Sequence, residues 1–75
     1  MTLTEAFGAV IRDAAEDQGI TLTDLAKQAG ISRATLYNWA DGHSTPTLVG
    51  LTRVADTLRI RGSELLRRAE DRSRP

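Results

Sequence analysis

A chain of 75 residues is long enough for one small domain and leaves no room for a second. It contains no cysteine and a single histidine, His43, which excludes disulfides, thiolate metal sites and metal sites built from several histidines. Ten basic and ten acidic residues give a formal net charge of zero, which argues against a protein that coats nucleic acid by charge alone.

The first predicted helix covers residues 4–18, because apolar residues recur there at helical spacing. Those residues are Leu3, Phe7, Val10, Ile11 and Ala14. Thr2 and Glu5 have the spacing of a capping box, and Gly19 suits the left-handed position that follows a last helical turn. We therefore expect an amphipathic helix with one face in the core.

The second predicted helix covers residues 22–29, with Thr21 as its N-cap and Gly30 at its end. Asp24 stands at the capping-box position. The expected inner face consists of Leu25, Ala26 and Ala29.

The third predicted helix covers residues 33–41, with Ser32 as its N-cap and Gly42 at its end. Leu36 and Trp39 lie three residues apart, so both are expected to point into the core.

A loop over residues 43–46 leads to a fourth predicted helix over residues 48–59, which Thr47 caps. The expected inward stripe consists of Leu48, Leu51, Val54, Ala55 and Leu58. Gly50 weakens this helix and marks either a close approach of another element or an exposed position.

The last predicted helix extends from Gly62 to Asp71 and offers Leu65, Leu66 and Ala69 to the core. The polar residues 72–75 are expected to form a flexible tail after a domain of residues 1–71. No strand-like alternation competes with the helical pattern, so we expect an all-α fold.

Only Gly30, Ile31 and Ser32 separate the second predicted helix from the third, and this layout is typical of a helix-turn-helix unit. The glycine reverses the chain, a small residue such as Ala26 lets the two helices cross closely, and a buried Ile31 holds the turn. In such a unit the second helix projects its N-terminal end and outer face into the major groove of DNA.

A longer pattern surrounds this turn. Its positions are Ile20, Thr21, Asp24, Leu25, Ala26, Ala29, Gly30, Ile31, Ser32, Thr35, Leu36, Trp39, Gly42, Pro46 and Thr47, followed by Leu51, Val54, Ala55, Leu58, Glu64, Leu65 and Leu66. This pattern resembles the phage Cro/repressor-type (lambda-repressor-like, XRE) family of helix-turn-helix regulators, and the resemblance extends over residues 3–68. It implies a compact five-helix, lambda-repressor-like domain.

The resemblance implies that base-reading residues lie at the start and on the outer face of the third helix. Here those positions hold Arg33, Ala34, Tyr37 and Asn38. Arg33 can bond O6 and N7 of guanine, and Asn38 can bond N6 and N7 of adenine. Ala34 can contact a thymine methyl group, and Tyr37 can reach a base edge or a phosphate. An ordinary exposed helix face is the alternative for all four residues.

The resemblance also implies phosphate contacts at the helix caps and in the loop after the third helix. The matching residues that can donate are Thr21, Ser32, His43, Ser44, Thr45 and Thr47. Relatives usually carry Lys or Arg in this loop, so the chain departs from the family pattern. Hydroxyl groups and helix N-terminal amides can still donate to phosphate, although capping and turn formation alone would also explain these residues.

A second departure concerns an ion pair. Many relatives pair an arginine late in the first helix with a glutamate after the third. The matching positions here hold Ala15 and Ala40, so we expect two small residues to pack in place of the ion pair.

The expected function is a sequence-specific, DNA-binding transcriptional regulator of a bacterium or phage, most simply a cytoplasmic, nucleoid-associated repressor. A lone module buries only about 600–1,000 Å² on DNA, so we expect a homodimer on a two-fold-related operator with half-sites about 34 Å apart. Val49, Ile60 and Leu66 are candidate dimer contacts, and each can equally belong to the core. No cofactor, metal, small-molecule ligand or membrane contact is expected.

An antitoxin-like subunit, which binds a partner protein and its own promoter, is the alternative. The acidic side chains of the first helix could then face a basic partner; they are Glu5, Asp13, Glu16 and Asp17. An enzyme is not expected, because no set of nucleophile, base and stabilising group is present.

The charges are spread unevenly along the chain. Residues 1–24 carry five acids and one base, whereas residues 25–75 carry nine bases and five acids. Few cations fall in the expected interface, which predicts weak non-specific DNA binding and an affinity that falls only gently with salt.

Overall fold

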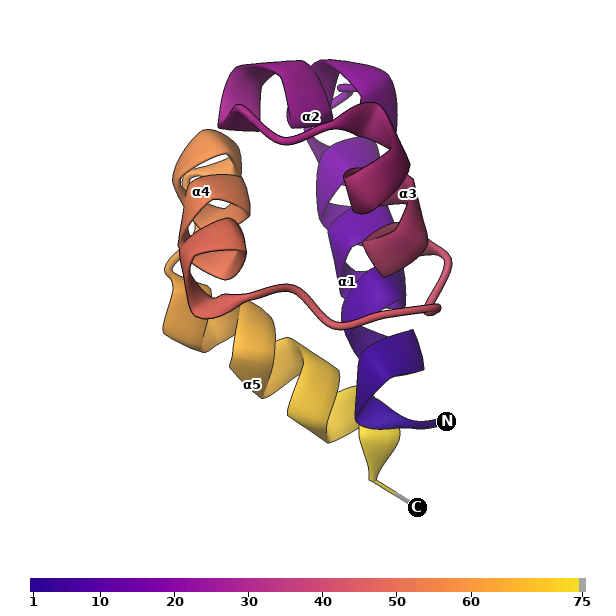
Figure 1. The fold of residues 1–75 in the computed structure, drawn as a ribbon. Coiled ribbons are helices and arrows are strands. Elements are labelled where there is room, and N and C mark those ends of the chain that lie inside the picture. The colour runs from indigo at the N-terminus through magenta and orange to yellow at the C-terminus, as the bar shows by residue number, and fades with distance from the viewer. Residues whose placement is uncertain (75) are drawn as a thin grey trace.

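The computed structural model describes residues 1–74 and contains five helices and no strand among them (Figure 1). The helices are α1 (Leu3–Asp17), α2 (Leu22–Ala29), α3 (Arg33–Ala40), α4 (Leu48–Leu58) and α5 (Gly62–Ser73). α1 packs most extensively against α5 and also contacts α3, while α2 bridges α3 and α4. The all-α, five-helix fold is therefore confirmed. No helix of the described part is long and apolar enough to cross a membrane.

Each of the first four helices begins with the hydroxyl cap that its sequence predicts. Thr2 and Glu5 form the full capping box, in which Thr2 Oγ1 accepts from the Glu5 N–H at 3.1 Å and Glu5 Oε1 accepts from the Thr2 N–H at 2.8 Å. Hydrogen bonding of the Glu5 carboxylate by the backbone N–H of Thr2, and then by the Thr2 side chain, lowers the pKa of Glu5, because it favours the charged form. Thr21, Ser32 and Thr47 each accept from the backbone N–H three residues later, at 3.0–3.1 Å.

All three glycines expected after a helix adopt the left-handed conformation, and Gly19 lies just beyond α1 with a φ of 70°. Gly30 ends α2 with a φ of 71°, and Gly42 lies just beyond α3 with a φ of 77°. α4 instead ends at Arg59, whose φ of 58° lies in the left-handed region that favours glycine. No sequence signal predicted an arginine in that conformation.

The core is a single hydrophobic cluster to which every helix contributes. Its largest fully buried side chains are Ile11, Leu25, Leu36, Val54, Leu58 and Leu65. Burial of each such side chain contributes about 1.5–3 kcal/mol. Ile60 packs against this cluster, whereas Val49 and Leu66, the other two candidate dimer contacts, are exposed.

Three residues expected in the core are exposed, and one of them, Leu66, keeps 40% of its surface. Leu3 keeps 43% of its surface and Leu48 keeps 81%. Each is the first residue of its helix, and helical side chains lean toward the N-terminus, so these two extend past the end of the helix bundle. With Pro46 and Leu66 they line a shallow apolar hollow.

Two glycines make room for α3, one for its backbone against α1 and one for the ring of Trp39 against α4. A Cβ atom on Gly8 of α1 would lie 2.5 Å from the carbonyl oxygen of Trp39 and 2.6 Å from that of Ala40. A Cβ atom on Gly50 of α4 would lie 2.4 Å from Cη2 of Trp39. Of the two interpretations of Gly50, close approach is therefore the correct one.

α5 is longer than predicted, because Arg72 and Ser73 belong to the helix rather than to a flexible tail. The guanidinium of Arg72 forms an ion pair with Asp13 of α1, and Ser73 Oγ donates to the Glu70 carbonyl at 3.0 Å. These contacts stabilise the polar last turn of α5. The composition of residues 72–75 alone does not predict them. Pro75, the last residue of the predicted tail, lies outside the described residues.

Candidate nucleic-acid interface

The turn between α2 and α3 has the geometry that the sequence predicts. Gly30 adopts the left-handed conformation, and the Ile31 N–H donates to the Ala26 carbonyl at 2.9 Å. Ala26 is buried at the crossing of the two helices, and Ile31 is half-buried against the core. The helix-turn-helix unit is thus built from the residues expected to build it.

Arg53 of α4 supports this turn, and no signal in the sequence predicts this role. Its Nη1 atom donates to the Gly30 carbonyl at 3.4 Å. The two residues lie 23 positions apart, so no local spacing links them. The contact depends on the packing of α2 against α4.

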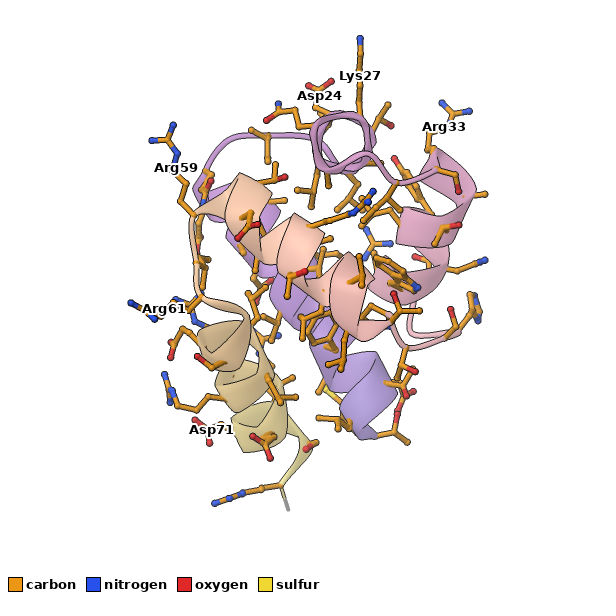
Figure 2. All side chains as sticks on the ribbon, turned by 60° about the vertical axis from the view of Figure 1, so that its left-hand side comes forward. Asp24, Lys27, Arg33, Arg59, Arg61 and Asp71 are labelled. Atoms are coloured by element: carbon orange, nitrogen blue, oxygen red, sulfur yellow. The ribbon has the colours of Figure 1, made fainter. Side chains whose placement is uncertain are left out.

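Three of the four candidate base-reading residues project from α3 into solvent. Arg33, Ala34 and Asn38 are exposed, and Figure 2 shows Arg33 extending away from the start of α3. The opposite side of α3 carries Leu36 and Trp39, which are buried. α3 therefore presents one polar face outward while the other face anchors it.

Tyr37 differs from the other three. It is half-buried, and its hydroxyl lies 3.1 Å from Oγ1 of Thr23 on α2, at hydrogen-bonding distance. The hydrogen bond fixes the ring between the two helices. Tyr37, Arg33 and Ala34 line one open hollow on the outer face of α3.

The candidate phosphate contacts flank α3 on two sides. Thr21 and Thr47 use their oxygens as helix caps, which leaves each hydroxyl proton available to a phosphate. Ser32 is more constrained, because its Oγ accepts from the Thr35 N–H and also bonds Thr35 Oγ1 at 2.6 Å. The remaining three, His43, Ser44 and Thr45, are exposed in the loop after α3.

The charges near α3 are few. Lys27 and Arg33 extend into solvent from neighbouring positions, with Asp24 beside Lys27 (Figure 2). Neither Lys27 nor Arg33 forms an ion pair within residues 1–74. The outer surface of the unit therefore offers about two cations to DNA and one opposing carboxylate.

An ion pair links α1 to the end of α3, although the two positions where the family pairs an arginine with a glutamate hold small residues here. Arg12 of α1 forms an ion pair with Asp41, and its Nε donates to the Ala40 carbonyl at 3.2 Å. Ala15 and Ala40 are buried as small packing residues, as expected. The ion pair is therefore an additional contact, formed three residues before Ala15 and one residue after Ala40. The arginine thus holds the C-terminal end of α3 against α1 and neutralises Asp41.

Comparisons with known proteins agree with this arrangement. The family model of the Cro/C1-type HTH DNA-binding domain matches residues 10–71. A crystal structure of the clp gene regulator ClgR from Corynebacterium glutamicum is similar with a TM-score of 0.90 at 27% identity, covering 97% of this chain and 78% of that chain. A second ClgR structure from the same organism gives 0.89 at 27% identity, with 99% and 96% covered.

A further similar structure is the restriction-modification controller protein C.AhdI from Aeromonas hydrophila. Its TM-score is 0.79 at 26% identity, and the match covers 83% of this chain and 94% of that chain. No curated protein matches the chain significantly.

Proposed function

Because this chain belongs to the Cro/C1-type HTH family of DNA-binding domains, we propose that it is a transcription regulator, and specifically a repressor, that inserts α3 into the major groove of an operator. The observation that carries the proposal is the outer face of α3, where Arg33, Ala34 and Asn38 are exposed while the opposite face is buried. A helix held in this way can enter a groove without repacking.

Each exposed residue has a role in this proposal. The guanidinium of Arg33 forms two hydrogen bonds with O6 and N7 of a guanine, and the amide of Asn38 bonds N6 and N7 of an adenine. Each such bidentate contact contributes about 1–3 kcal/mol of discrimination against a wrong base.

Phosphate contacts position α3 in the groove. The hydroxyls of Thr21 and Thr47 donate to phosphates, together with the N-terminal amides of α2 and α4, and the loop with His43, Ser44 and Thr45 follows the DNA backbone. Lys27 adds a cation beside α3. Few of these groups are charged, so selectivity depends on the base contacts.

Two copies are needed for tight binding, because one domain of this size covers a short site. We propose a homodimer whose α3 helices enter successive major grooves about 34 Å apart on a two-fold-related operator. The ClgR and C.AhdI structures are described as those of a gene regulator and a controller protein, and similarity to them supports a regulatory role.

The antitoxin-like alternative gains no support. None of the three similar structures is described as an antitoxin. Within α1, Asp13 is paired with Arg72 of α5, which reduces the acidic surface available to a basic partner.

In-vitro selection from a random duplex library, followed by gel-shift titration, tests the proposal. We expect a recovered sequence motif, and we expect an Arg33→Ala/Asn38→Ala double variant to bind the selected duplex at least tenfold more weakly. Arg61→Ala is the matched control, because Arg61 is exposed on another side of the molecule (Figure 2). Recovery of no motif, or unchanged binding by the double variant, would overturn the proposal.

A further inference from the structure

The hollow on the outer face of α3 has a defined composition. Arg33, Ala34 and Tyr37 line it, so its walls are a methyl group, an aromatic ring and the aliphatic stem of an arginine. The hydrogen bond between the hydroxyls of Tyr37 and Thr23 holds the ring as a wall of the hollow. The hollow is therefore apolar on two sides and bordered by a cation.

An apolar hollow facing the major groove has few possible occupants. The C5-methyl group of thymine is the one apolar group that projects from the bases into this groove, where cytosine has only a C5 hydrogen and the other groups are hydrogen-bond donors or acceptors. A 5-methylcytosine carries the same methyl group on the same carbon. Ala34 and the ring of Tyr37 thus fit a 5-methylpyrimidine, whereas an unmethylated cytosine would leave the hollow without a partner.

The position of Arg33 identifies the neighbouring base. Its guanidinium matches guanine O6 and N7, and it borders the same hollow. Because Arg33 borders the hollow itself, the guanine that it bonds would lie beside the base whose methyl group fills the hollow.

We propose that α3 reads a two-base step in which a 5-methylpyrimidine adjoins a guanine, with Ala34 and Tyr37 contacting the methyl group and Arg33 bonding the guanine. This inference rests on the proposed function and adds the identity of one step within the operator. Tyr37 acts in it as a wall of the methyl site, which differs from the base-edge or phosphate role expected from the sequence.

The test compares duplexes that differ by one methyl group. Starting from the duplex selected by the purified protein, each thymine is replaced in turn by deoxyuridine, which removes only the methyl group. We expect one position per half-site, next to a guanine, at which affinity falls about fourfold, the effect of one buried methyl group. The same replacement outside the half-site is the control and should leave affinity unchanged.

Two further duplexes distinguish the sources of the methyl group. At the sensitive position, a T·A pair is exchanged for a C·G pair with or without a 5-methyl group on the cytosine. Tighter binding of T·A than of methylated C·G assigns the site to thymine, and the reverse order assigns it to a methylated cytosine–guanine step. Both results support recognition of a 5-methylpyrimidine.

A variant connects the effect to the hollow. In Ala34→Gly the affinity ratio between the thymine and deoxyuridine duplexes should fall toward one, and in Arg61→Ala it should stay near fourfold. Because the ratio compares two duplexes on the same protein, any loss of folded protein cancels. A selected motif without a methyl-sensitive position, or a ratio unchanged in Ala34→Gly, would overturn this inference alone. Failure to select any motif would overturn the proposed function as well.

Discussion

The substitution Gly8→Ala tests the contact that places α3 against α1. The added Cβ atom would lie 2.5 Å from the Trp39 carbonyl oxygen and 2.6 Å from that of Ala40. Ordinary contact begins at 3.4 Å, so the two helices would have to separate by almost 1 Å. The obstructing atoms belong to the backbone, which cannot rotate away as a side chain can.

The expected cost follows from two opposing effects. Alanine in a helix interior is favoured over glycine by about 1 kcal/mol. Overpacking a dense interior costs about 1–3 kcal/mol, and two backbone carbonyls place this site at the upper end. The net loss in the free energy of unfolding is then about 2 kcal/mol. In a domain of this size that lowers the melting temperature by about 8–16 °C.

Circular dichroism during thermal and urea unfolding measures this loss. Gly62→Ala is the matched control, because its Cβ atom would lie 3.8 Å from Cγ of Leu51, which is an ordinary contact. The control should be neutral or more stable by up to about 1 kcal/mol. If Gly8→Ala were as stable as the wild-type protein, the close approach of α1 and α3 would not limit the packing, and the reasoning would be refuted.

Three further predictions concern other parts of the molecule. Arg59→Gly should stabilise the protein by about 0.5–1 kcal/mol in urea unfolding, because Arg59 adopts a left-handed conformation that glycine adopts without strain; a loss of stability would contradict this. Hydrogen bonds from Arg67 and Arg68 lower the pKa of Glu64 to about 2, so its contribution to stability is complete above about pH 4.5 and disappears as the pH falls toward 2. Glu64→Gln should therefore flatten the acid side of a plot of melting temperature against pH, and an unchanged slope would count against it. A dimer should contact DNA with about four cations, so a plot of the logarithm of the binding constant against the logarithm of salt concentration should have a slope of about −4. A slope of −6 or steeper would contradict so few contacts.

The parts of the fold that depend on neighbouring residues could be predicted from the sequence. The caps Thr2, Thr21, Ser32 and Thr47 each bond a backbone N–H three residues away, so spacing alone identifies them. The range 22–29 predicted for the second helix coincides with α2 for the same reason. Local hydrogen bonds leave local signals, which located the first four helices, whereas α5 has no side-chain cap and was located by the spacing of its apolar residues.

Contacts between distant segments could not be predicted in the same way. Two examples are the ion pair of Arg12 with Asp41 and the close approach of Gly8 to α3. Both depend on the angle at which the helices cross, and the periodicity of the sequence does not predict that angle. Leu48 shows a related failure, because its spacing fits the apolar stripe although its place at the first turn puts it outside the core.

The candidate site shows the same division. Exposure of Arg33, Ala34 and Asn38 follows from helical periodicity. The hydrogen bond that fixes Tyr37 to Thr23 joins two helices and could be found only in the structure.

The packing of α5 along α1 also bears on how the protein finds its operator. It places the basic end of the sequence against the acidic beginning, as in the pair of Arg72 with Asp13 (Figure 1). Opposite charges folded together cancel at a distance, so little long-range attraction steers the molecule toward DNA. Association should then proceed at the unsteered rate of about 10⁵–10⁶ M⁻¹s⁻¹, with little sliding along non-operator sequence. The time needed to occupy the operator would therefore be set by the number of copies in the cell.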